Sequence, residues 1–193
     1  MKYEKLRTKL KTGDIVLFSG KGFVSWLIKW FTKSKWSHVG MAMRILDYDM
    51  VLLWESTTLT KTKDIHGKSR SGVRIVPLSK ALANYKGEVG IRYLLTNKGL
   101  NKDVLAKMRN EFTGRKYEQN MLQLFKSAYD WTLGKNKRDM SSVFCSELIA
   151  EAYQRLGYLS TKQPSNEYTP DDFGADIQLL AGAELGEIIE VEV

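Results

Sequence analysis

The sequence predicts one compact domain, spanning residues 1–193, in which strand-like segments come first and helical segments dominate later. The length of 193 residues is close to the usual size of a single domain. Hydrophobic residues make up 43% of the chain and charged residues 27%, a balance typical of a packed core. The apolar residues also change their period, from short runs and alternation to helical stripes after about residue 102.

Short apolar runs and alternation predict the strands, and turn signals separate them. The first strand follows the turn Thr12-Gly13-Asp14, and the turn Asp47-Tyr48-Asp49 separates the second from the third. The expected strands are 15–18, 37–45, 50–56, 73–78, 89–94 and a final alternating segment, 188–193.

Apolar residues at helical spacing predict the helices. A short, mostly buried helix is expected at 23–31 and another at 78–85, while the polar and basic segment 57–72 is expected to be an exposed loop. In the second half, helices are expected at 102–113, 122–131 and 144–156. The last of these has the strongest pattern, and Gly157 marks its end.

The charge and the cysteine content restrict the function classes. A net charge of +8 favours an anionic partner, such as an acidic substrate, lipid or nucleic acid. One cysteine excludes an internal disulfide and suits a reducing compartment. Two histidines and one cysteine match no zinc-ligand spacing, so no metal or other cofactor is expected. No apolar signal core follows the first residues and no apolar stretch is long enough to cross a membrane, so a cytoplasmic location is expected.

Cys145 is the first candidate for chemistry because it lies at the start of the strongest predicted helix, behind the candidate caps Ser141 and Ser142. The first turn of a helix presents free N–H groups and a positive dipole end, which favour a thiolate. The alternative is an inert buried cysteine.

His38 and Glu55 are the candidates for its partners. His38 lies in an apolar strand beside Gly40, where an imidazole needs polar partners, and a histidine near a cysteine acts as its base. If the turn at 47–49 pairs position 38 with about 57, Glu55 is a same-face diagonal neighbour of His38 within side-chain reach. A slip of one residue would remove Glu55 from the site. His66 is the rival third member, although its basic loop favours a solvated role.

The order of these motifs resembles the circularly permuted NlpC-type papain-like family, with the YiiX/YaeF branch most similar and lecithin:retinol acyltransferase more distant. The motifs are Gly13-Asp14-Ile15-Val16, Ser37-His38-Val39-Gly40, Glu55, Gly114-Arg115-Lys116-Tyr117-Glu118, Phe144-Cys145-Ser146-Glu147-Leu148 and Thr169-Pro170-Asp171-Asp172-Phe173. They span about residues 12–175, and the histidine strand precedes the cysteine helix, which is the permuted order.

The resemblance implies an α+β fold, in which a small, mostly antiparallel sheet packs against helices. It also implies Cys145 as nucleophile, His38 as base, Glu55 as orienting residue and Tyr117 beside the oxyanion site. The expected activity is that of a cysteine hydrolase which cleaves an amide bond, in a peptidoglycan-type peptide or related amide, through an acyl-thioester.

Two alternatives remain open. Trp26, Trp30 and Trp36 with interleaved lysines are typical of a membrane-surface contact and would suit a lipid-directed acyltransferase or deacylase. The lysines at 61–70 and 135–138 would suit a non-catalytic basic binding module. Nucleic acid is not the expected partner, because aromatic residues are not interleaved with those lysines.

Overall fold

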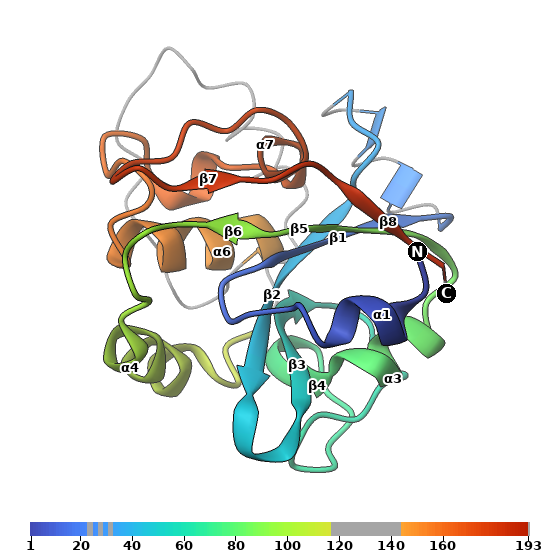
Figure 1. Cartoon of the computed structure of the whole chain (residues 1–193). Coiled ribbons are helices and arrows are strands. Elements are labelled where there is room, and N and C mark those ends of the chain that lie inside the picture. Colours follow the sequence, from blue (N-terminus) through green and yellow to red (C-terminus); the bar gives the residue numbers. More distant parts are fainter. Residues whose placement is uncertain (23–24, 27–28, 31–32, 117–143, 193) are drawn as a thin grey trace.

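A six-stranded antiparallel sheet forms the centre of the protein in the computed structural model, which describes residues 1–192 except 23–24, 27–28, 31–32 and 117–143 (Figure 1). The strands coincide with short apolar runs between turns. Successive side chains of a strand point to opposite faces of the sheet, so a run of apolar residues can contribute to a hydrophobic core on each face. In spatial order the strands are β4 (Gly72–Pro77), β3 (Met50–Thr57), β2 (His38–Ile45), β1 (Ile15–Gly20), β5 (Gly87–Arg92) and β8 (Ile189–Val191). The predicted α+β class with an antiparallel sheet is confirmed.

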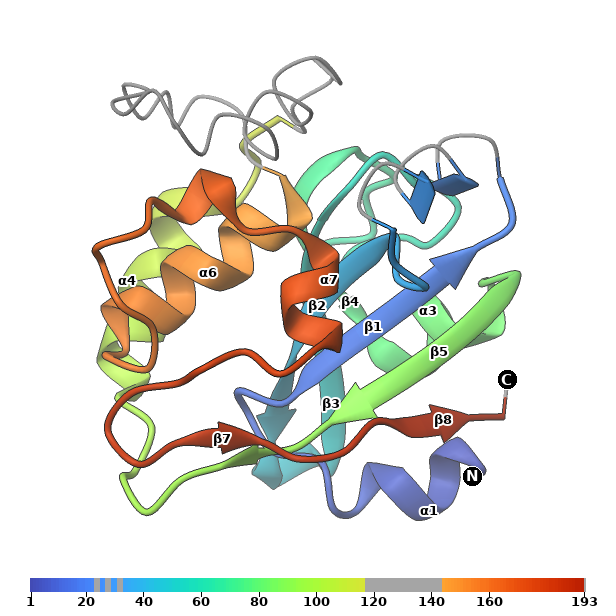
Figure 2. The same ribbon diagram turned by 90° about the horizontal axis from the view of Figure 1, so that it is seen from above.

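Helices cover both faces of this sheet (Figure 2). On one face, α4 (Lys102–Phe112), α6 (Cys145–Arg155) and α7 (Pro170–Gly174) enclose the larger hydrophobic core. On the other face, α1 (Tyr3–Arg7) and α3 (Leu78–Ala83) cover a smaller core. A second sheet joins β6 (Leu94–Leu95) to β7 (Glu184–Leu185), and single 3-10 turns occur at η1 (Leu46–Tyr48) and η2 (Ser165–Glu167).

Helix α6 lies in the interior, as its apolar pattern predicts. Every residue from Cys145 to Gln154 is buried. The helix begins at Cys145, and the Glu147 carboxylate accepts a hydrogen bond of 3.3 Å from the backbone N–H of Phe144, the N-cap residue. The candidate caps Ser141 and Ser142, and the predicted helix 122–131, lie outside the described residues.

The tryptophans expected near residue 30 do not share one environment. Trp26 and Trp30 have exposed fractions of 53% and 62%, so the expectation that both lie in a buried core helix is wrong. Trp36 is buried at 3% and packs closely against Gly90 and Gly174. It therefore belongs to the core and not to a surface cluster with Trp26 and Trp30.

The segment 57–72 is also less exposed than expected. Thr62 and Asp64 are buried, although most of their neighbours in this segment are exposed. The Asp64 carboxylate accepts hydrogen bonds from the backbone N–H groups of His66 (2.9 Å) and Lys68 (2.8 Å). A polar residue that satisfies the backbone of its own turn is stabilised in a buried position, which composition alone does not reveal.

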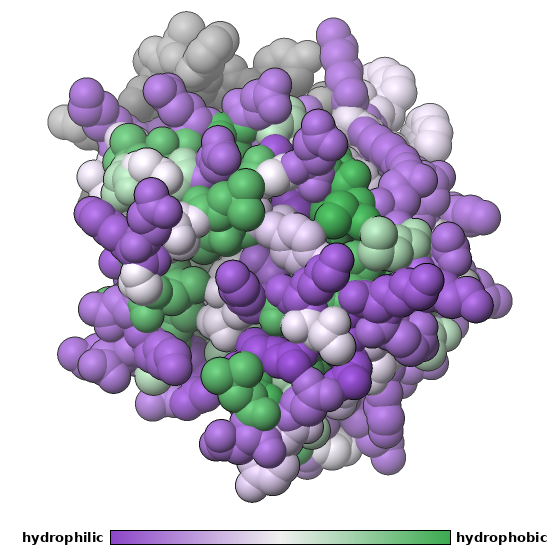
Figure 3. Space-filling view, viewed as in Figure 1, coloured by the Kyte–Doolittle hydropathy of each residue, from purple (hydrophilic) through white to green (hydrophobic). Residues whose placement is uncertain are grey.

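The two ends of the described chain lie side by side (Figure 1). The amino group of Met1 donates a hydrogen bond of 2.7 Å to the carbonyl oxygen of Glu190 in β8. On the face viewed in Figure 3, hydrophobic residues form separate patches among hydrophilic ones. Among the described residues, none of the helices has the length and apolar character that crossing a membrane requires.

Candidate active site

The register of β2 against β3 brings Glu55 toward His38. Met41 pairs with Trp54 and Ile45 pairs with Met50 across the hairpin. Continued to the start of β2, this register sets position 38 opposite 57, as the turn predicts. The turn itself is η1 followed by Asp49 in the left-handed region (φ 44°). Because strand side chains alternate, this register puts Glu55 on the same face as His38.

His38 and Glu55 are in direct contact. The Nε2 atom of His38 lies 2.7 Å from Oε2 of Glu55, and the side chains are 15% and 5% exposed. The ring of Phe18, on the neighbouring strand β1, lies 5.3 Å from the His38 ring, centroid to centroid. The imidazole is therefore held by a strong hydrogen bond on one edge and by an aromatic neighbour on one face.

Cys145 interacts with the other edge of the same imidazole. Its side chain is a hydrogen-bond partner of His38, and its residue is 4% exposed. Helix α6, which begins at Cys145, packs against β2 and β3, so the packing of the whole helix positions the sulfur.

The electrostatics of the site favour a protonated His38. Burial by itself lowers the pKa of His38, but the charge and hydrogen bond of Cys145, followed by those of Glu55, raise this pKa from 6.5 to about 10. An imidazole flanked by two groups that become anionic is stabilised as imidazolium. The arrangement therefore holds a thiol, an imidazole and a carboxylate in one hydrogen-bonded line.

Arg74 extends this line to a fourth side chain that sequence reasoning missed. Its Nε and Nη2 atoms donate hydrogen bonds of 3.0 and 2.9 Å to Oε1 of Glu55, and the two residues are direct cross-strand neighbours on β4 and β3. Burial raises the pKa of Glu55, but His38 and then Arg74 outweigh it, so the pKa lies below 4.5. One feature of the sequence could have identified Arg74 as a site residue: it lies between the apolar residues Val73 and Ile75 in a predicted strand.

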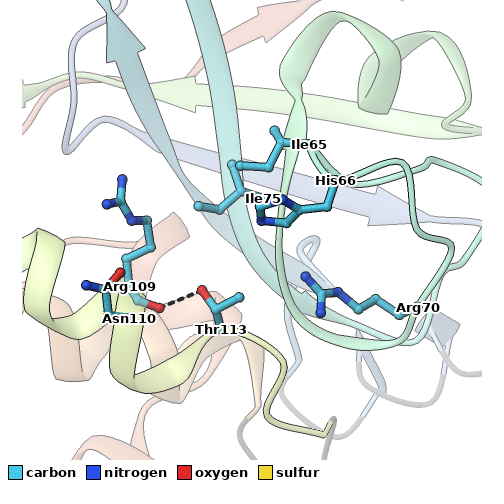
Figure 4. A pocket seen from close by; sticks show the side chains of 7 residues that line it. All are labelled: Ile65, His66, Arg70, Ile75, Arg109, Asn110 and Thr113. Atoms are coloured by element: carbon cyan, nitrogen blue, oxygen red, sulfur yellow. Dashed lines mark hydrogen bonds between the residues drawn. The ribbon is translucent and has the colours of Figure 1, made fainter.

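The other two candidate residues are Tyr117 and His66. Tyr117 is outside the described residues. His66 lies on the 57–72 loop and faces α4, where it lines a cavity with residues of that helix (Figure 4). Of the two candidates for a third member, Glu55 is the one in contact with His38.

The geometry of the site identifies a class of known proteins. An antiparallel sheet whose histidine strand precedes, in sequence, a buried helix that begins with cysteine defines the circularly permuted papain-like class. The chain belongs to the family of permuted papain-like amidase enzymes, YaeF/YiiX, C92, whose model matches residues 9–173. The predicted resemblance is thereby confirmed, and family membership supports a papain-like hydrolase.

One solved structure shares the fold over nearly the whole chain. The crystal structure of metalloprotein yiiX from Escherichia coli O157:H7 has a TM-score of 0.50 and 18% sequence identity, covering 94% of this chain and 96% of that chain. No curated protein matches the sequence. The relative is described as a metalloprotein, whereas in the part of this chain that the structure describes no group of three His, Cys, Asp or Glu side chains is arranged to hold a metal ion.

Proposed function

We propose that the protein is a cysteine hydrolase that cleaves an amide bond through an acyl-thioester, with Cys145 as nucleophile, His38 as acid and base, and Glu55 as the residue that orients His38. The observation that carries this proposal is the line of contacts from Cys145 to His38 and on to Glu55, at the start of a buried helix. A peptidoglycan-type peptide or a related anionic amide is the proposed substrate, and the net charge of +8 favours such a partner.

The first half of the reaction forms the thioester. The Cys145 thiolate attacks the carbonyl carbon, and the C–N bond breaks as protonated His38 transfers its proton to the leaving amine. Helix α6 begins at Cys145, so the positive end of its dipole lies beside the sulfur and favours the oxyanion as it forms.

The second half releases the acid. Neutral His38 takes a proton from water, the resulting hydroxide attacks the thioester carbonyl, and the carbon–sulfur bond breaks to restore the thiolate. Throughout, Glu55 accepts the hydrogen bond from Nε2 of His38 and stabilises the imidazolium, while Arg74 keeps the Glu55 carboxylate ionised and fixed in place.

Intact-mass spectrometry after exposure to muropeptides tests the proposal. A covalent adduct on Cys145, with the mass of the acyl part of the peptide, is the expected result, together with release of the amine fragment. Cys145→Ala is expected to abolish both the adduct and turnover. Cys145→Ser serves as the matched control, because it keeps the size and polarity of the side chain without a thiolate. Undiminished hydrolysis by Cys145→Ala would refute the proposed nucleophile.

A lipid-directed acyl transfer or deacylation is the second candidate function, and the exposure of Trp26 and Trp30 favours it. Their rings stack 6.5 Å apart, beside the basic residues Lys29 and Lys33. An exposed aromatic pair among lysines suits the surface of an anionic membrane.

Co-sedimentation with anionic phosphatidylserine vesicles at low salt tests this candidate. Binding is expected to fall at least several-fold in Trp26→Ser/Trp30→Ser and to persist in Tyr48→Ser, which removes an exposed aromatic ring elsewhere. Failure of the unmodified protein to co-sediment rules this candidate out and leaves the amide hydrolase proposal untouched.

A further inference from the structure

A second concave site lies between the 57–72 loop, the edge strand β4 and the C-terminal part of α4. The cavity has a volume of about 450 Å³, within the range of small-molecule sites. His66 and Arg70 line it from the loop, Ile75 from β4, Arg109 from α4 and Thr113 from the C-cap of α4 (Figure 4). None of these residues belongs to the contacts among Cys145, His38 and Glu55.

Positive charge dominates this cavity. The guanidinium groups of Arg70 and Arg109 enter from opposite walls, and the His66 ring lies on the loop side (Figure 4). Nε of Arg70 pairs with the carboxylate of Asp64 at 2.7 Å. The half-buried Arg109 side chain makes no hydrogen bond or ion pair within the described ranges of the chain. Among the described residues, no side chain neutralises the Arg109 guanidinium in this partly enclosed space. A guanidinium binds carboxylate or phosphate oxygens through two parallel N–H groups.

The loop wall of the cavity is fixed by the rest of the fold. The backbone N–H of Ile65 donates a hydrogen bond of 2.9 Å to the carbonyl oxygen of Ile75. Nη1 of Arg74 donates to the carbonyl oxygens of Thr62 and Arg70, at 3.1 and 3.3 Å. Since these bonds already order the loop, a ligand does not have to order it on binding, and this lowers the entropic cost of association.

The apolar side chains restrict the kind of ligand. Ile65 and Ile75 also line the cavity, beside the charged groups. A small inorganic anion would satisfy the guanidinium groups alone, whereas an anion attached to a short apolar group would use both parts of the lining.

We propose that this cavity is an anion-binding site for a small ligand that presents a carboxylate or phosphate to Arg109 and Arg70 and an apolar group to Ile65 and Ile75. The site goes beyond the proposed hydrolase function and does not depend on it, because neither arginine takes part in that reaction.

Calorimetric titration of the Cys145→Ala protein tests the site without interference from turnover. The probes are N-acetyl-leucine, its uncharged amide N-acetyl-leucinamide, and inorganic phosphate. Saturable binding of the acid, at least about tenfold tighter than that of the amide, is expected, because the amide keeps the apolar part and lacks the charge. Tighter binding of phosphate than of the acid would identify a phosphate-bearing ligand, and the reverse a carboxylate-bearing one.

Arg109→Gln is expected to weaken the binding of the acid or of phosphate by about tenfold or more. Lys107→Gln is the matched control, because it removes one positive charge from an exposed position on the same helix outside the cavity lining, and it should change affinity by less than about twofold. Equal affinity for acid and amide, no saturable binding of either anion, or equal losses in both variants would overturn the proposal. The acid-to-amide comparison decides the matter even if Arg109→Gln fails to fold.

Discussion

His38 is the residue at which burial and charge compete most directly. Burial lowers its pKa, whereas the neighbouring Cys145 and Glu55 raise it, and the neighbours prevail with a pKa of about 10. This raised pKa favours the protonated imidazole at neutral pH, which is the form that donates the proton in the proposed reaction.

The pH titration of His38 checks this balance. Because the pKa in the folded protein is raised above the unfolded value of about 6.5, the stability from this charge is fully present below pH 6.5 and is lost as pH rises through about 10. Histidine ring NMR signals should show a midpoint near 10 for His38. In Cys145→Ala the midpoint should fall markedly, since Cys145 provides the largest contribution that raises it.

Removal of the second histidine, His66, makes the assignment of the His38 signal unambiguous. His66→Asn removes the only other histidine signal and so assigns the remaining one. An unchanged His38 midpoint in Cys145→Ala would contradict the proposed interaction between the sulfur and the imidazole.

Arg74 is the residue whose loss should cost the most stability at the site. Arg74 and Glu55 are 3% and 5% exposed, so Arg74→Gln leaves a buried carboxylate without its cationic partner. We expect the free energy of unfolding to fall by about 3 kcal/mol, measured by urea denaturation. Turnover should fall as well, because Glu55 is then free to turn away from His38. Arg74→Lys should restore part of both losses.

An exposed ion pair provides the comparison for Arg74. Lys35 contacts Glu88 at 2.8 Å and Glu190 at 2.7 Å, with 45% of its side chain exposed. Lys35→Gln should cost less than about 1 kcal/mol, because solvent screens exposed pairs. Equal costs for Arg74→Gln and Lys35→Gln would contradict the buried pairing.

At the scale of elements, the β2–β3 hairpin positions the site because both strands are packed without spare room. A Cβ atom at Gly40 would lie 2.6 Å from Cδ1 of Leu53 and 3.1 Å from the carbonyl oxygen of Trp54. The same atom would lie 3.4 Å from Cβ of Glu55. The close approach of these two strands therefore requires glycine at position 40.

Gly40→Ala should disturb both stability and activity. The Leu53 side chain must shift and the carbonyl of Trp54 in β3 must yield slightly, which we expect to cost about 1 to 3 kcal/mol and to lengthen the contact between His38 and Glu55. Gly99→Ala is the control, since no atom lies within 4 Å of its added Cβ. Thermal unfolding and turnover of the two variants test this, and an undisturbed Gly40→Ala would show that the register does not hold the site.

At the scale of the whole molecule, Asp14 connects segments that are far apart in the sequence. Its carboxylate accepts hydrogen bonds from the backbone N–H groups of Lys11 (2.7 Å) and Leu94 (2.9 Å). Burial is the largest influence on its pKa and raises it to about 6, despite these bonds. The fold thus buries a carboxyl group that is more stable when protonated.

The stability of the molecule should therefore depend on pH through Asp14. Because the folded pKa exceeds the unfolded value of about 3.9, the folded state binds more protons between pH 4 and 6. The contribution of Asp14 to stability is full below pH 4 and is lost as pH rises through about 6, by roughly 2 to 3 kcal/mol. Urea denaturation across this window should show the decline in the unmodified protein and not in Asp14→Asn. Parallel curves would contradict the raised pKa.

Local patterns were sufficient for the six strands of the main sheet, for the hairpin register and for the start of α6, but they did not reveal the short strands β6 and β7. The turn at 47–49 defines the pairing of β2 with β3, and the helical stripe after Phe144 places Cys145 at a helix start. These are short-range features, because neighbouring residues determine both the turn and the periodicity.

The residues that the sequence did not reveal depend on contacts between distant segments. The partnership of Arg74 with Glu55 requires the alignment of β4 with β3, across a loop whose length does not specify a register. Trp26 and Trp30 are exposed and Trp36 is buried because only part of the segment that contains them packs against the core. The apolar residues of this segment are not confined to one face, so their pattern does not predict which side is buried.

The sequence by itself determined the order of histidine strand and cysteine helix and the chemical types available for catalysis, because these follow from local periodicity and residue identity. The resemblance of its motifs to the permuted papain-like family implied the antiparallel α+β class. Only the tertiary structure decided which groups touch: the imidazole between sulfur and carboxylate, the arginine behind that carboxylate, and the cavity with two guanidinium groups at the edge of β4. These contacts join residues from three strands, two helices and the 57–72 loop, and the packing of those segments sets their distances.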